Sequence, residues 1–144
     1  MSVKMNVAEL SAFMVEQFPQ VAEDFRIEHL APHEITVRLH VSERNLRPGG
    51  TVSGPSMFSL ADVSIYLAIL AMIGPKALAV TTNCSIDFMR KPAAGADLIA
   101  TARILKLGKV LAVGDVLIFS EGSEKPVARA ALTYSIPADP VTSG

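Results

Sequence analysis

The chain has 144 residues, of which 50% are hydrophobic and 19% charged, and its formal net charge is -1 at pH 7. A chain of this length forms one domain with its own core. The lack of a basic field argues against nucleic acid as a partner. A single cysteine, Cys84, excludes an internal disulfide or a cysteine metal cluster. The mean hydropathy of +0.39 favours burial of surface between subunits, so we expect a homodimer or a homotetramer built as a dimer of dimers.

The N-terminal segment "MSVKMNVAELSAFMVEQF" lacks the cationic start, continuous apolar core and cleavage site of a signal peptide, so we expect a cytoplasmic protein. The apolar run 63–73 is too short to span a membrane unless it is extended past Asp62 or across Gly74 and Pro75. We therefore expect no membrane partner.

The first third of the chain predicts a helix followed by a hairpin. Apolar residues recur at spacings of three and four in residues 6–18, which predicts a helix with one buried face that ends before Pro19. Residues 23–31 and 34–41 alternate between polar and apolar, which predicts two strands joined by a turn at Pro32-His33.

Residues 55–73 are apolar on every side and have Pro55 in the first turn, which is typical of a helix enclosed by other structure. Four extended segments follow, with Gly108-Lys109 predicted as a two-residue turn between the middle two. They are residues 79–89, 96–107, 109–119 and 125–136. The pattern predicts an α+β fold in which an antiparallel sheet wraps around a long central helix. We expect residues 1–137 to form a single domain and residues 138–144 to form a disordered tail.

Asp62 is a lone carboxylate within the apolar stretch "SGPSMFSLADVSIYLAIL". Its neighbours three and four positions away on a helix supply no cation. Because a buried, unpaired carboxylate costs several kcal/mol, Asp62 must face a cleft, accept hydrogen bonds or have a raised pKa. These environments suit a catalytic base or nucleophile. They suit equally a structural carboxylate that accepts hydrogen bonds from another segment or subunit, and the spacing leaves both interpretations open.

The segment "GGTVSGP" places Gly54 at the start of the predicted helix, where free N–H groups and the helix dipole can hold an oxyanion. The same glycines can instead serve a tight turn. Asp62 lies eight residues beyond Gly54, roughly 12 Å along the helix axis. One subunit's Gly54 therefore cannot easily act together with the same subunit's Asp62.

The stretch "SGPSMFSLAD" resembles the "HGG…FSLAD" signature of the hotdog-fold acyl-CoA thioesterases, in particular the PaaI-like branch of the phenylacetate pathway. The segment "SIDFMRKPAAGADLIATARILKLGK" is similar to the stretch after the central helix in that family, and the resemblance covers residues from about 45 to 135. It implies that Asp62 is the catalytic base or nucleophile and that the Gly54 amide polarises the thioester carbonyl. The resemblance also implies that these two groups come from different subunits of a dimer.

Other positions match the family more loosely. Thr81 falls where relatives have a Ser or Thr near the nucleophilic water, although it can also be an ordinary strand residue. Asn45 lies near the position of a loop asparagine that orients the water, and Arg47 occupies the direct match. Ser53 and Pro55 replace the histidine and the second glycine of the signature. A serine hydroxyl can cap the helix and hydrogen-bond a carbonyl, but it supplies no positive charge.

Two basic pairs match family positions that meet the phosphates and pantetheine of coenzyme A. They are Arg90-Lys91 and the pair Lys106 and Lys109, and Gly108 in the turn between these lysines is included in the expected CoA-binding set. The alternative is that these side chains are simply solvated at the ends of strands. No resident cofactor is expected, because CoA is part of the substrate.

The resemblance therefore predicts a thioesterase that hydrolyses an acyl-CoA to a free acid and CoA. Two alternatives remain open. A non-catalytic acyl-CoA or fatty-acyl binding protein is suggested by the departures at Ser53, Pro55 and Arg47, and a hotdog dehydratase would need a histidine at position 53. No metal site is expected, because His29, His33 and His40 have no cysteine or acid cluster beside them. Three candidates to line the acyl tunnel could equally be core: Met57, Phe58 and Tyr66.

Overall fold

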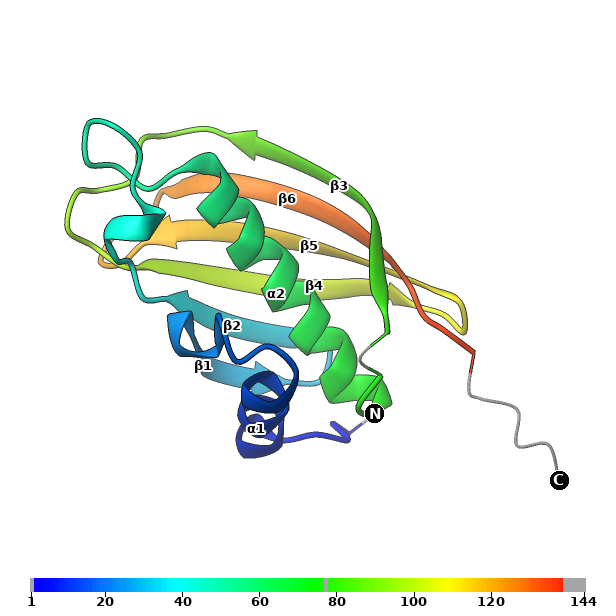
Figure 1. The fold of residues 1–144 in the computed structure, drawn as a ribbon. Helices are drawn as coiled ribbons and strands as arrows, with labels where there is room; N and C mark the ends of the chain where they lie inside the picture. The colour runs from blue at the N-terminus through cyan, green and yellow to red at the C-terminus, as the bar shows by residue number, and fades with distance from the viewer. Residues whose placement is uncertain (1, 77, 139–144) are drawn as a thin grey trace, which may run out of the picture.

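The computed structural model describes residues 2–76 and 78–138, which form one antiparallel sheet and two α-helices (Figure 1). The helices are α1 (Val7–Gln17) and α2 (Gly54–Ile73), and the strands are β1 (Phe25–Ala31), β2 (Glu34–Leu39), β3 (Val80–Phe88), β4 (Leu98–Leu107), β5 (Leu111–Ser120) and β6 (Pro126–Ser135). The strand order is β1-β2-β4-β5-β6-β3, and α2 lies across one face of the sheet. The predicted α+β arrangement of a sheet around a central helix is confirmed. The predicted tail lies, from residue 139 on, outside the described residues.

Helix α2 forms the centre of the core because it is apolar all round. Ser53 caps it, since its Oγ accepts a hydrogen bond from the Ser56 N–H, and Pro55 occupies the first turn. The helix ends at Gly74, whose φ of +95° suits glycine. By length and a hydropathy of 1.9, α2 could also span a membrane, but 67% of the apolar window is buried inside the protein, as in the core helix of a folded domain.

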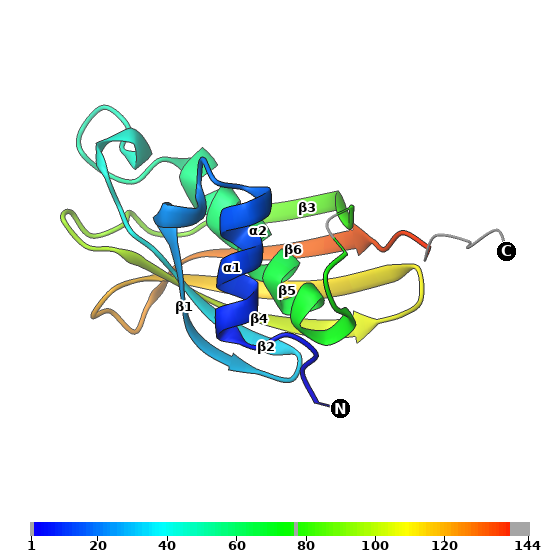
Figure 2. The same ribbon diagram turned by 60° about the horizontal axis from the view of Figure 1, so that its bottom comes forward.

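Helix α1 lies on the same side of the sheet as α2, next to β1 (Figure 2). Asn6 begins it with a capping box, in which its side chain accepts from the Glu9 N–H and the Glu9 side chain accepts from the Asn6 N–H. Leu10 and Met14 are its buried residues. The helix therefore covers the flank of α2 that the sheet leaves open.

The β4–β5 hairpin differs from the prediction by one residue. The Gly108 N–H donates to the Leu111 carbonyl at 2.8 Å, so the turn residues are Lys109 and Val110 rather than Gly108 and Lys109. The predicted strand at 109–119 consequently begins too early, because β5 starts at Leu111. A bulge in β4 between Ile104 and Lys106 shifts the register just before this turn.

Gly114 lies where β5 packs tightly against a side chain of α2. A Cβ there would lie 2.5 Å from Ile65 Cδ1 and 2.8 Å from the Arg103 carbonyl oxygen. Gly114→Ala should therefore lower the free energy of unfolding by about 1–3 kcal/mol, measured by urea denaturation. Adding Ile65→Val removes Cδ1 and should recover part of the loss if the helix contact matters. A urea midpoint unchanged by Gly114→Ala would contradict this packing.

Candidate active site

The Asp62 carboxylate is half-buried in α2 and is held by two hydroxyl groups. Its Oδ1 accepts hydrogen bonds from Thr81 Oγ1 at 2.6 Å and from the Tyr134 hydroxyl at 2.5 Å. Tyr134 also lies 3.1 Å from the Asp62 backbone carbonyl, to which it can donate. Within the part of the chain that the structure describes, no cation pairs with Asp62 and its Oδ2 accepts no hydrogen bond. One oxygen is therefore fixed, and the other remains available for chemistry.

Tyr134 is a site residue that the sequence interpretation missed. It comes from β6 and is buried, and burial together with the neighbouring Asp62 charge raises the pKa of its hydroxyl. Tyr134 thus remains a neutral donor near neutral pH. The alternating pattern of β6 could have indicated Tyr134, because it is a tyrosine at one of the inward-facing positions. The other inward-facing residues are small or aliphatic: Ala128, Ala130 and Leu132.

A cavity of about 400 Å³ opens beside Asp62. Its lining is mostly apolar and comes from α1 and the following segment, α2, β6 and the start of β3: Met14, Phe18, Val21, Asp62, Val63, Tyr66, Leu78, Ala79, Val80, Thr81 and Tyr134. Burial raises the pKa of Tyr66 to about 12, so its ring lines the cavity without charge. Of the other two predicted tunnel residues, Met57 is buried in the core and Phe58 is exposed. The cavity can hold an apolar group next to a carboxylate.

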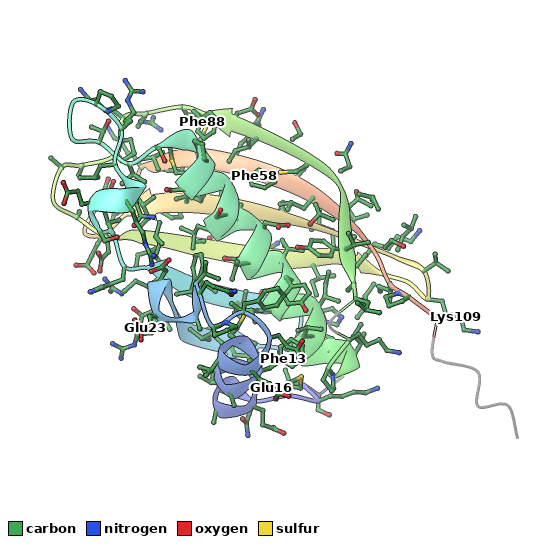
Figure 3. The ribbon with its side chains drawn as sticks, in the orientation of Figure 1. Phe13, Glu16, Glu23, Phe58, Phe88 and Lys109 are labelled. Atoms are coloured by element: carbon green, nitrogen blue, oxygen red, sulfur yellow. The ribbon has the colours of Figure 1, made fainter. Side chains whose placement is uncertain are left out.

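The start of α2 forms a second part of the candidate site. Among the described residues, the Gly54 N–H donates no hydrogen bond, and a Cβ on Gly54 would lie 3.2 Å from Phe88 Cζ. Ser53 Oγ accepts from the Ser56 N–H at 3.3 Å and lies 3.0 Å from Ser56 Oγ. Figure 3 shows Phe88 and Phe58 near this end of the helix. The free amide and the Asp62 carboxylate are thus separated along α2 within one chain.

Asn45 lies beside the start of α2 rather than beside Asp62. Its Oδ1 accepts from the Ser42 N–H at 2.9 Å, its Nδ2 donates to Ser56 Oγ at 3.2 Å, and its backbone carbonyl accepts from the Ser53 N–H at 2.7 Å. Asn45 is also buried. Within the described chain, its side chain therefore orders the loop that leads to Gly54.

The two basic pairs lie at opposite ends of the sheet. Arg90 follows the end of β3 and donates to the Pro126 carbonyl at 2.9 Å, and Lys91 is next to it. Lys106 and Lys109 belong to the β4–β5 hairpin, whose tip lies at the end of the sheet away from Phe88 (Figure 3). No group of three His, Cys, Asp or Glu side chains within the described ranges could hold a metal ion.

A family model for the thioesterase superfamily matches residues 49–127, which is more than half of the chain. The chain belongs to the thioesterase superfamily. The matched residues include α2 with Asp62 and β3 with Thr81, whereas α1 and Tyr134 lie outside them. The superfamily match therefore covers the carboxylate but only part of its surroundings.

Individual relatives agree with this assignment. A solved structure from Silicibacter sp. TM1040, provisionally described as a thioesterase, is 62% identical, covers 96% of both chains and has a TM-score of 0.90. The PaaI protein from the phenylacetic acid degradation operon of E. coli is 25% identical, over 92% of this chain and 97% of its own, with a TM-score of 0.77. Acyl-coenzyme A thioesterase 13 of Mus musculus is 28% identical over 89% of this chain and 92% of its own. The predicted resemblance to PaaI-like hotdog thioesterases is confirmed.

Proposed function

We propose that this superfamily member is an acyl-CoA thioesterase, which hydrolyses the thioester bond to release a free acid and CoA. The observation that carries the proposal is the Asp62 carboxylate, with Oδ1 fixed by two hydroxyls and Oδ2 without a hydrogen bond among the described residues, on the wall of an apolar cavity. The relatives named as thioesterases support the same reaction class.

Asp62 can promote hydrolysis either as a general base or as a nucleophile. As a general base it takes a proton from water, the oxygen attacks the thioester carbonyl, and the C–S bond breaks to release the CoA thiolate, which is then protonated. As a nucleophile it attacks the carbonyl itself, and water hydrolyses the resulting anhydride. In both routes the carbonyl oxygen becomes negative. The Gly54 N–H at the positive end of α2 stabilises that charge. In other enzymes, the removal of one such oxyanion donor raises the activation free energy by about 3–4 kcal/mol.

A two-fold dimer along β3 would bring these groups together. β3 is an edge strand with apolar residues exposed at both ends, Val80 at 55% and Phe88 at 53%, and such an edge is a template for pairing. Thr81, near the start of β3, donates a hydrogen bond to Asp62, and Phe88, at the end of β3, lies against Gly54. Antiparallel pairing about a two-fold axis places the start of one β3 beside the end of the other. Asp62 of one subunit then faces Gly54 of its neighbour.

The same pairing moves the basic pairs toward one another. Arg90 and Lys91 follow the end of β3 next to Gly54, whereas the Lys109 hairpin lies near the start of β3. In the proposed dimer, Arg90 and Lys91 of one subunit approach Lys106 and Lys109 of the other at the mouth of a shared site. Four cations there suit the phosphates of CoA.

Thiol release from a panel of acyl-CoAs, from acetyl to long-chain and phenylacetyl, tests the proposed reaction. We expect turnover of at least one member. Tight binding of CoA esters without thiol release would instead identify the non-catalytic binding protein suggested by Ser53 and Pro55.

Removing the hairpin cations tests the CoA site. Lys106→Ala with Lys109→Ala should raise KM for acyl-CoA by about tenfold and change kcat little, because they bind a part of the substrate that does not react. Steady-state kinetics at low salt measure this, and Arg26→Ala, an exposed cation on β1 at the other sheet edge, is the matched control. An unchanged KM in the double variant would place the phosphates elsewhere.

Removing the tyrosine hydroxyl tests the hydrogen bonds to Asp62. Tyr134→Phe retains the ring but deletes one of the two hydroxyl donors that hold Asp62 Oδ1 in place. We expect kcat to fall by about tenfold and KM to change little, because the lost hydrogen bond positions the reacting carboxylate and not the substrate. Thr81→Val should act in the same direction. An unchanged kcat with a lower free energy of unfolding would mean that Tyr134 acts only through packing.

A further inference from the structure

Helix α1 contributes a wall to the cavity beside Asp62. Met14 and Phe18 line it from α1 and its C-cap, opening onto the same space as Asp62 and Tyr66 of α2. The Phe18 ring lies edge-on to Tyr66, with centroids 5.7 Å apart and an interplanar angle of 86°. Tyr66 is itself one helical turn from Asp62. The cavity thus extends from the carboxylate past Tyr66 to Phe18.

The chemistry of this wall suits the acyl part of the substrate rather than CoA. Seven of the lining residues are apolar: Met14, Phe18, Val21, Val63, Leu78, Ala79 and Val80. The hydroxyls of Thr81 and Tyr134 point to Asp62 and are already occupied there. Pantetheine amides and phosphates would lose their hydration in such a space without compensation, whereas an aliphatic chain gains from burial.

The Phe18 side chain is partly exposed, so a bound ligand can cover it or displace it. It is 37% exposed, whereas Met14, four residues earlier, is 5% exposed. An acyl chain that reaches the ring would cover apolar surface that the described chain leaves open to solvent. Phe18 and α1 also lie outside the residues matched by the superfamily model, 49–127. A substitution of Phe18 therefore changes the cavity without changing a residue of the segment that carries Asp62.

We propose that Phe18 is a specificity-determining residue that closes the acyl pocket and sets the length of an unbranched apolar acyl group. The inference rests on the proposed thioesterase function and adds its substrate class. Each methylene buried before the chain reaches Phe18 raises kcat/KM by about fourfold. Chains that extend beyond the ring must displace it, and kcat/KM then falls.

The test is a series of saturated acyl-CoAs from acetyl to palmitoyl, with kcat/KM measured for wild type, Phe18→Ala and Phe18→Trp. Phe18→Ala should move the optimum to chains longer by about two to four carbons, and Phe18→Trp should move it to shorter chains. Val15→Ala, a change at a 62% exposed position of α1 outside the cavity lining, is the matched control and should keep the wild-type optimum. Opposite shifts in the two Phe18 variants are the diagnostic result.

Two outcomes would overturn the inference. An unmoved optimum in both Phe18 variants would place the end of the acyl pocket elsewhere, and an equal loss at every chain length would make Phe18 a packing residue only. Dissociation constants of free saturated fatty acids, measured by calorimetry on the same proteins, provide a readout that needs no turnover. If the wild type hydrolyses nothing, the proposed function fails, and the length dependence of binding still decides the role of Phe18.

Discussion

Asp62→Asn should lower kcat by a factor of about 10² to 10⁴ and leave KM for the best acyl-CoA nearly unchanged. An amide can neither take a proton from water nor attack a thioester, but it fills the same volume. Its carbonyl oxygen can still accept the hydrogen bonds of Thr81 and Tyr134, which are the contacts that hold the side chain in place. The loss should therefore appear in the chemical step rather than in substrate binding or folding.

Thiol-release kinetics and thermal unfolding of the same preparations measure this prediction. Asp115→Asn is a matched control, because Asp115 is an exposed carboxylate of β5, an interior strand away from the β3 edge at which the dimer is proposed. It should retain wild-type turnover. Wild-type rates in Asp62→Asn would show that the carboxylate serves structure or assembly, which is the alternative that its sequence context left open.

The fold was predictable because its local patterns agree with its long-range packing. An all-round apolar helix can be buried only if other structure surrounds it, and the strands after residue 78 supply that structure. The β4–β5 turn was misplaced because the bulge between Ile104 and Lys106 changes the register, and a bulge leaves little trace in an alternating pattern.

The site was only partly predictable. Asp62 stands out as a charge among apolar residues, and the resemblance to the family signature makes it a candidate together with Gly54. Tyr134 does not stand out, because its contact with Asp62 spans 72 positions and depends on where β6 lies in the sheet. The position of Asn45 near the start of α2 likewise depends on how the loop from Ser42 to Ser53 folds back. Such contacts follow from tertiary structure rather than from local spacing.

Gly54→Pro should lower kcat by a factor of about 10² to 10³, because it removes the one N–H proposed to stabilise the oxyanion. Gly54 is the first residue of α2, a position where proline suits the backbone and no intrahelical hydrogen bond is lost. Gly54→Ala is the matched control, since it adds a Cβ against the Phe88 ring but retains the N–H. A similar loss in both variants would assign the effect to crowding at Phe88 instead of to the amide.

Mixing two inactive variants tests whether the site is shared. In a heterodimer of Asp62→Asn and Gly54→Pro, a site built across the interface combines the intact Asp62 of one subunit with the intact Gly54 of the other. The second site carries both changes and stays inactive. Random reassociation makes half of the dimers mixed with one active site each, so about one quarter of wild-type activity should return. A site confined to one chain recovers nothing on mixing, because each subunit then lacks one of its two groups.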